Sequence, residues 1–269
     1  FLRGRLLDYQ WDFEGAAREY RAALERAPRH APAAISLARV ELSQQHIEEA
    51  LRLYRLAAES LFEPQPALVG MARCYRELGK LSEARQVLER AMARPKDRLE
   101  EAYRFVGERS ETAQAQVPAE MAQLELAEDQ PDEAIPWFEQ ALSANPQDYK
   151  TRFAYAQTLR RVGSMEEAER ETARAESSRT AFESGDRLID AVRKNAADVE
   201  ARYQLGLIFR WHLPDNQGIV WLQSVLEYDP DHAGAHAKLA EYFAAHQSDN
   251  PEYARLAELH AQRAQAEEK

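Results

Sequence analysis

The 269-residue sequence is 45% hydrophobic and 30% charged and contains few glycines and prolines, a composition typical of a folded helical protein. Its formal charge of −11 repels phosphate groups, so we expect no nucleic-acid partner. The single cysteine, Cys74, excludes an intrachain disulfide and a multi-cysteine metal site, and no apolar run is long enough to span a membrane.

Small and aromatic residues recur at fixed slots along the chain, most often 34 residues apart. Ala16, Tyr20 and Ala23 begin this series. The same slots then hold Ala50, Tyr54 and Ala57; Ala84, Leu88 and Ala91; Ala134, Phe138 and Ala141; Ala168, Thr172 and Ala175; and Gly218, Leu222 and Val225. A second series lies twelve positions upstream, at Gly4, Ala38, Ala72, Ala122, Ala156, Gly206 and Ala240. The period predicts two closely packed helices per repeat, with each pair burying its apolar stripe on the next.

The spacing also predicts how the chain is divided. We expect an N-terminal block over residues 1–98, middle repeats over 115–182 and a C-terminal block over 199–269. Two steps are 50 residues long, which adds about one helix to the period each time. The first added segment, at about 97–114, predicts an extra helix. The second, at about 176–198, predicts one long helix from about Met165 to Lys194.

These slots resemble the tetratricopeptide repeat family over nearly the whole chain. Pro28, Pro146 and Pro230 occupy the family's closing slot, and Gly79 and Gly163 lie at the turn between paired helices. The sequence departs from the family at its Tyr slot, which holds Glu41 and Glu125 in two repeats, and at its Trp slot, which holds Ala34, Leu68, Pro118, Arg152, Arg202 and His236. The resemblance implies an all-α fold: a single right-handed superhelical solenoid over residues 1–269, with about seven helix pairs and two helical insertions.

No pattern predicts a catalytic or metal site. His232 and His236 have the spacing of two ligands on one helix face, but no Glu follows His232 and the next imidazole, His246, is almost three turns away. Gly79 and Lys80 lack both the earlier glycine and the following Ser or Thr of a phosphate-binding loop. We therefore expect no enzymatic activity, no metal and no cofactor.

The family resemblance implies that the residue after each small slot of a first helix lines the concave face. In this column Arg5, Arg39 and Arg73 recur one repeat apart, so we expect their guanidinium groups to form a basic strip. Further members of the predicted strip are Arg76, Gln157, Arg160 and Arg161, with Lys150 near its edge. Such a strip attracts a peptide that bears carboxylates. The alternative is that these arginines pair with glutamates of adjoining helices.

Two residues of the C-terminal block complete the candidate partner-binding set. Gln204 occupies the slot where family members that clamp a peptide carboxylate use asparagine. The same slot holds Ser36, Gly70, Glu120 and Ala154 in other repeats, so the sequence does not predict such a clamp. Trp211 lies at a turn between helices, where an exposed ring would act as a docking anchor.

The sequence therefore predicts a non-catalytic scaffold or adaptor that binds another protein or peptide on its concave face, as a subunit of a larger complex. Two alternatives stay open: a substrate-recruiting or regulatory segment of a longer enzyme, and a sensor of a small peptide or metabolite. We expect a soluble protein of the cytoplasm or periplasm, and a targeting sequence before Phe1 is compatible with this expectation.

Overall fold

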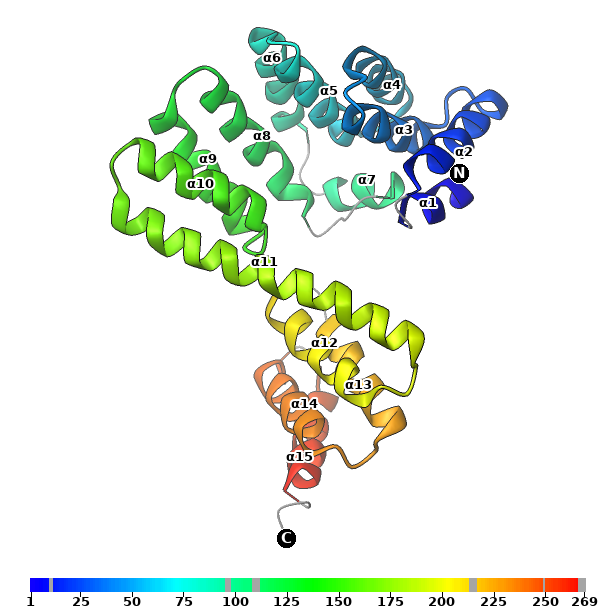
Figure 1. Ribbon diagram of the computed structural model, residues 1–269, viewed down its shortest axis with the longest axis vertical. Helices are drawn as coiled ribbons and strands as arrows, with labels where there is room; N and C mark the ends of the chain where they lie inside the picture. Colours follow the sequence, from blue (N-terminus) through cyan, green and yellow to red (C-terminus); the bar gives the residue numbers. More distant parts are fainter. Residues whose placement is uncertain (10–11, 95–97, 108–111, 213–216, 249, 266–269) are drawn as a thin grey trace. The chain divides into compact units, whose positions relative to one another are not determined.

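The computed structural model describes residues 1–9, 12–94, 98–107, 112–212, 217–248 and 250–265. All the regular secondary structure in these residues is helical, as predicted (Figure 1). The first eight helices are α1 (Leu2–Tyr9), α2 (Phe13–Arg26), α3 (Ala31–Ser43), α4 (Ile47–Ser60), α5 (Gln65–Glu77), α6 (Leu81–Met92), α7 (Leu99–Phe105) and α8 (Ala113–Ala127). They are followed by α9 (Pro131–Ala144), α10 (Tyr149–Arg161), α11 (Met165–Lys194), α12 (Val199–His212), α13 (Gln217–Tyr228), α14 (Ala233–Ala245) and α15 (Glu252–Ala264).

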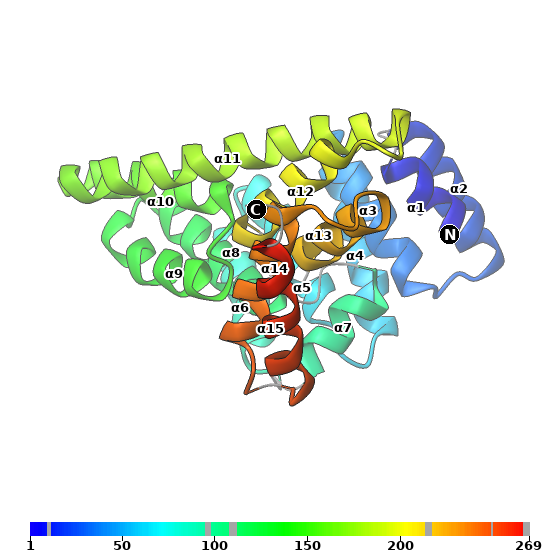
Figure 2. The ribbon, with the colours of Figure 1, turned by 90° about the horizontal axis from the view of Figure 1, so that it is seen from below.

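Consecutive helices pack in pairs, which are α1 with α2, α3 with α4, α5 with α6, α8 with α9, α12 with α13 and α14 with α15 (Figures 1 and 2). The small slots lie where the helices approach each other: Ala38, Ala72 and Ala122 are fully buried. At two of these slots, Gly4 and Gly206, an added Cβ would come within 2.7 Å of the paired helix, at the side chains of Tyr20 and Leu222 respectively, so these contacts require glycine. The predicted pairing of helices at small residues is therefore confirmed.

The turn between the helices of a pair requires one residue in the left-handed region. Gly79 and Gly163 have φ values of 69° and 89°, and Gln45 and Asp129 hold the equivalent positions with φ values of 64° and 60°. After the turn at Gly79, the N–H of Lys80 donates to the carbonyl of Tyr75 at 2.9 Å, which satisfies one of the last carbonyls of α5.

The two glutamates that replace the family's tyrosine are buried between successive pairs. Glu41 accepts a hydrogen bond from Arg21 of the preceding pair. The carboxylate of Glu125 accepts two hydrogen bonds from Arg85, from Nη1 at 3.0 Å and from Nη2 at 2.9 Å. The hydrogen bonds from Arg85 to Glu125 and to the nearby Glu128 raise the pKa of the Arg85 guanidinium. Each departure at the family's Tyr slot is thus explained by a guanidinium from a second helix.

Both predicted insertions are present as helices. The first is α7, and the second extends α11 to Met165–Lys194, drawn as one unbroken helix in Figures 1 and 2. The chain forms two compact units, Phe1–Thr172 and Ala173–Lys269, whose boundary falls within α11. The division into repeat blocks stays a prediction. In the part of the chain described here, every helix falls short of the length or apolarity needed to cross a lipid bilayer.

Candidate partner-binding surface

The extra helix α7 covers part of the face formed by the first helices of the N-terminal unit. It contacts α5 and α8, and in Figure 1 it lies on the side of α3 and α5 that faces away from α4 and α6. Val106, just after α7, belongs to the same buried cluster as Ile35 and Val69 of those first helices. The sequence analysis predicted this helix, but not that it would cover part of the predicted concave face.

Arg5 lies against the end of α7. A Cβ added at Gly107 would come within 2.2 Å of its Nη1 atom, and the φ of 79° at Gly107 already favours glycine there. The helix macrodipole makes the C-terminal end of α7 partly negative, so a guanidinium at this position is favourable. Arg5 therefore contacts the chain's own helix on the face where the sequence analysis expected a partner.

Three other arginines of the predicted strip form ion pairs with neighbouring helices. Nη2 of Arg39 lies 2.7 Å from Oδ2 of Asp8. Arg73 pairs with Glu120 through its Nε atom, and Nη2 of Arg76 lies 3.9 Å from the same carboxylate. These contacts match the alternative that the sequence left open, in which the arginines join adjacent helices. A partner-binding role for Arg5, Arg39, Arg73 and Arg76 stays a prediction.

The predicted strip residues Lys150, Gln157 and Arg160 lie on α10 and, unlike the arginines above, form no ion pair with a described residue. Lys150, Gln157 and Arg160 are all exposed, and their spacing of seven and three residues places them on one side of the helix. Arg160 donates to the hydroxyl of Thr172 at 2.8 Å, and among the described residues no carboxylate pairs with Lys150 or Arg160. Arg161, which was also expected in the strip, instead pairs with Asp129 at 2.6 Å. We call Lys150, Gln157 and Arg160 the α10 strip.

Local contacts hold α10 firmly in place. Asp148 caps the helix by accepting the backbone N–H of Thr151 at 3.1 Å. On the buried side, the ring of Tyr155 lies 5.8 Å from that of Phe138 on α9. Burial and the nearby carboxylates raise the pKa of the Tyr155 hydroxyl, so it stays neutral at physiological pH. The α10 strip is thus presented by a well-anchored helix.

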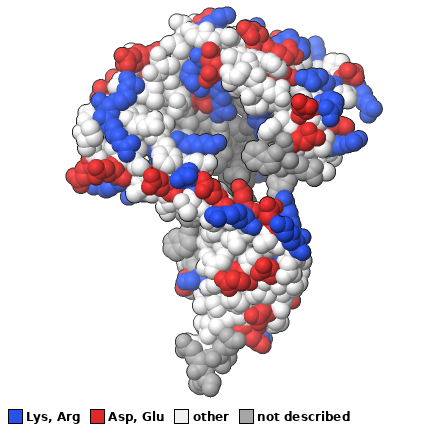
Figure 3. Space-filling model, viewed as in Figure 1, with Lys and Arg blue, Asp and Glu red and all other residues white. Residues whose placement is uncertain are grey.

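Charges on the N-terminal unit are mixed over the face seen in Figure 3. Lys and Arg side chains alternate there with Asp and Glu side chains, and neither sign dominates a large area. Many basic groups are therefore close to acidic ones. Arg39, Arg73 and Arg76 each form an ion pair with a carboxylate, whereas no described carboxylate pairs with Lys150 or Arg160 of the α10 strip.

The two candidate partner-binding residues of the C-terminal unit are Gln204 and Trp211. Gln204 is partly buried, and its side-chain amide donates to Glu200 of the same helix at 2.7 Å. The side chain of Trp211 lies outside the described residues, so its role as an anchor stays a prediction.

The paired histidines of this unit make structural hydrogen bonds. His232 caps α14, with Nδ1 accepting from the N–H of Ala235 at 3.1 Å. Nε2 of His236 lies 2.9 Å from the carbonyl of Pro230 and therefore carries a hydrogen, while its Nδ1 lies 2.7 Å from Nδ1 of His260. Within the ranges that the structure describes, no group of three or more His, Cys, Asp or Glu could hold a metal ion.

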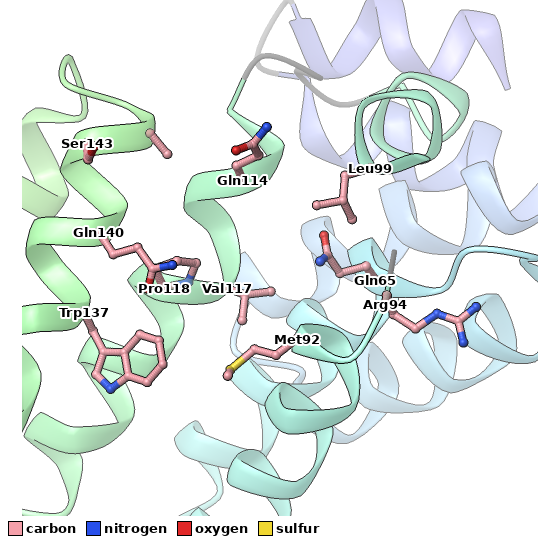
Figure 4. Close-up of a pocket in the computed structure, with 11 residues that line it drawn as sticks. Gln65, Met92, Arg94, Leu99, Gln114, Val117, Pro118, Trp137, Gln140 and Ser143 are labelled. Atoms are coloured by element: carbon pink, nitrogen blue, oxygen red, sulfur yellow. The ribbon is translucent and has the colours of Figure 1, made fainter. Parts of the chain in front are cut away.

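The sequence analysis also missed a cavity of about 480 Å³ within the N-terminal unit. It lies between α5, α6, α7, α8 and α9, beside the helical insertion (Figure 4). Pro118, the occupant of the family's Trp slot in its repeat, is one of the wall residues. A proline in place of a large ring was the available signal, because it leaves space and removes a backbone hydrogen bond.

Comparison with protein families finds the tetratricopeptide repeat in three segments of the chain, residues 1–67, 66–96 and 125–180. Together these segments cover more than half of the sequence. Among curated protein sequences, none matches the chain.

Several solved structures are similar in fold. A match to the APC/C hetero-tetramer Cut9-Hcn1 has a TM-score of 0.51 at 15% identity and covers 86% of this chain and 40% of that one. A structure of Pseudomonas aeruginosa pilF covers 98% of this chain and 94% of its own, with 20% identity and a TM-score of 0.48. YrrB, described as a TPR protein with an unusual peptide-binding site, has 21% identity and a TM-score of 0.42, over 82% of this chain and 98% of its own. At these identities the likeness concerns the fold alone.

Proposed function

Since this chain belongs to the tetratricopeptide repeat family, we propose that it is a non-catalytic scaffold that binds a partner protein on the first helices of its N-terminal unit. The observation that carries the proposal is the α10 strip, an exposed row of cationic and amide side chains on an anchored helix. The first part of the same face is covered by α7, so the proposed contact surface is centred on α10.

The chemistry of the α10 strip favours a partner segment that carries carboxylates. Arg160 offers a planar guanidinium that binds a carboxylate through two parallel hydrogen bonds, and Lys150 adds a mobile ammonium group. Gln157, between them, can hydrogen-bond to a peptide backbone. Because the whole chain carries a charge of −11, most of its surface repels an acidic partner segment. The α10 strip attracts that segment locally and so determines where it makes contact.

The test compares what co-purifies with three tagged forms of the full chain under native conditions. One form is the wild type, the second carries Lys150→Glu with Arg160→Glu, and the third carries Arg18→Glu with Arg90→Glu. Arg18 and Arg90 are exposed on the second helices α2 and α6, so the third form undergoes the same change in charge at a different face.

We expect a specific partner with the wild type and with the control variant, and at least a tenfold loss of that partner with the α10 variant. Reversal of two charges at a contact replaces attraction by repulsion, and a tenfold loss corresponds to about 1.4 kcal/mol. Equal retention by all three forms, with circular dichroism showing unchanged helicity, would refute the proposed surface.

A further inference from the structure

The inserted helix α7 lies on the first helices of the N-terminal unit in the way that a bound peptide helix lies in a groove. Its buried residues are Leu99, Ala102 and Tyr103, and the buried Val106 follows just after its end. These positions have the i, i+3, i+4, i+7 spacing with which an amphipathic helix presents one apolar face to a groove. The helix contacts α5 and α8, and Val106 belongs to a buried cluster that includes residues of α3 and α5. The face beneath α7 is therefore shaped to receive a helix.

Apolar contacts hold α7 in this groove. Its charged residues Glu100, Glu101 and Arg104 are exposed, and none of the three forms an ion pair with another described residue. The helix is seven residues long, and isolated helices shorter than about 12 residues are marginal in water. The helical form of α7 and its place in the groove therefore depend chiefly on a few apolar side chains.

The groove is larger than α7, which leaves two hollows beside it. One is the cavity of about 480 Å³, whose wall includes Leu99 of α7 (Figure 4). The other is a cavity of about 410 Å³ between Ala102 and Phe105 of α7 and the turn that joins α4 to α5. Surface that faces a hollow lacks partner atoms for dispersion contacts. The packing of α7 therefore leaves part of the available attraction of the groove unused.

The second cavity contains apolar surface that α7 does not cover. Phe62, in the turn before α5, lines this cavity and is 77% exposed, even though the guanidinium of Arg98 lies 5.4 Å from the centre of its ring. Large apolar side chains left exposed at a hollow mark binding surfaces for proteins. Ala102 is the residue of the buried face of α7 at this cavity, and its methyl group is too small to fill it. A leucine in its place would fill more of the space.

We propose that the groove beneath α7 binds an amphipathic helix of a partner protein and that α7 is an internal competitor for this site. A partner helix with the apolar spacing of α7 and a larger residue at the position of Ala102 gains the packing that α7 lacks. Because α7 is tethered to the groove, its effective concentration is high, and a partner helix binds only if it displaces α7. The inference rests on the proposed function, since it concerns the covered part of the same face.

The probe for the test is a fluorescein-labelled peptide of residues 98–107 that carries Ala102→Leu. A hydrocarbon bridge between positions 100 and 104, both exposed in α7, keeps it helical. Its affinity is measured by fluorescence anisotropy for the full-length wild type, a release variant and a control variant. The release variant, Tyr103→Asp with Val106→Asp, places two charges on the buried face of α7. The control variant, Arg104→Asp, makes the same change in charge on the exposed face.

We expect the release variant to bind the probe at least tenfold more tightly than the wild type and the control variant do. Buried aspartates keep α7 out of the groove, and a groove that is free for about a tenth of the time or less binds at least tenfold more weakly. Equal affinity of all three forms would show that α7 does not compete. A folded release variant that does not bind the probe would show that the groove does not accept a helix. Either result would overturn the proposal.

Hydrogen exchange of the wild type keeps the test decisive if the release variant does not fold. A helix that leaves its groove exchanges faster than the helices that form the groove. We expect the amides of α7 to exchange at least about tenfold faster than those of α5 and α8. Saturating probe should accelerate exchange in α7 and slow it in α5. Protection of α7 equal to that of α5, or exchange in α7 that the probe leaves unchanged, would contradict displacement.

The outcome can be separated from that of the proposed function. The double variant Lys150→Glu with Arg160→Glu should bind the probe as the wild type does, because the main contacts of α7 are with α5 and α8. Equal probe affinity of the wild type and the release variant, together with a partner that depends on the α10 strip, would refute the role of α7 and leave the scaffold function in place.

Discussion

Truncation of Phe138 to alanine is expected to destabilise the N-terminal unit strongly. Phe138 occupies the aromatic slot of its repeat, is 0% exposed and packs with Leu142, Tyr155 and Leu159 in one buried cluster. Removal of a buried phenylalanine ring costs about 3–5 kcal/mol, through lost burial and the cavity that is left. The ring pair with Tyr155 is part of this loss.

The assay is urea denaturation of the full chain, followed by hydrogen exchange of individual amides. Because stability in a stacked array is carried by neighbouring repeats, protection should fall in α8, α9 and α10. Protection in α14 and α15 should stay the same, since their buried cluster shares no residue with that of Phe138. Phe62→Ala is the matched control: this ring is 77% exposed, so its loss should change stability by less than about 0.5 kcal/mol.

Two results would refute this reasoning. A loss below about 1 kcal/mol for Phe138→Ala would mean that the aromatic slot is not a packing position. An equal loss of protection in all helices, α14 and α15 included, would indicate a single cooperative core in place of stacked pairs.

Three further outcomes follow from the structure. Gly79→Ala should destabilise the chain by about 1–2 kcal/mol in urea denaturation, because φ is 69° there; an unchanged midpoint would contradict a left-handed turn. Burial raises the pKa of the Cys74 thiol to about 12, so maleimide should label it at neutral pH only after unfolding, and rapid labelling of the native chain would show that it is accessible. Burial, His236 and Arg263 lower the pKa of His260, so as the pH falls the unfolded chain binds a proton at this residue before the folded chain does. Exchange protection of α15 should therefore be full above about pH 6.5 and decrease as the pH falls below that value. The variant His260→Phe should remove most of this pH dependence.

Much of the fold was predictable from the sequence, because each slot has one physical requirement that repeats along the chain. A close helix contact needs a small residue, as at Ala38 and Ala72, and a left-handed turn favours glycine, as at Gly79 and Gly163. The 50-residue steps revealed both inserted helices for the same reason: an added helix changes the spacing of slots that are otherwise constant.

The surface was less predictable, because contacts between distant segments do not follow the repeat. The column of arginines was visible in the sequence, but Asp8 and Glu120, which pair with Arg39 and Arg73, were not identified as their partners. The position of α7 over the first helices depends on how its apolar residues dock, and helical spacing alone gives no docking site. The cavity beside α7 depends on how several helices pack, and its one signal in the sequence was Pro118 in the family's Trp slot.

The most direct test of the scaffold account is a hydrogen-exchange footprint of the full chain with and without the protein that co-purifies with it. The account predicts added protection in α10, around Lys150, Gln157 and Arg160, and little change on the second helices α2, α4 and α6. Protection confined to those second helices, or no change in α10 at saturating partner, would contradict it.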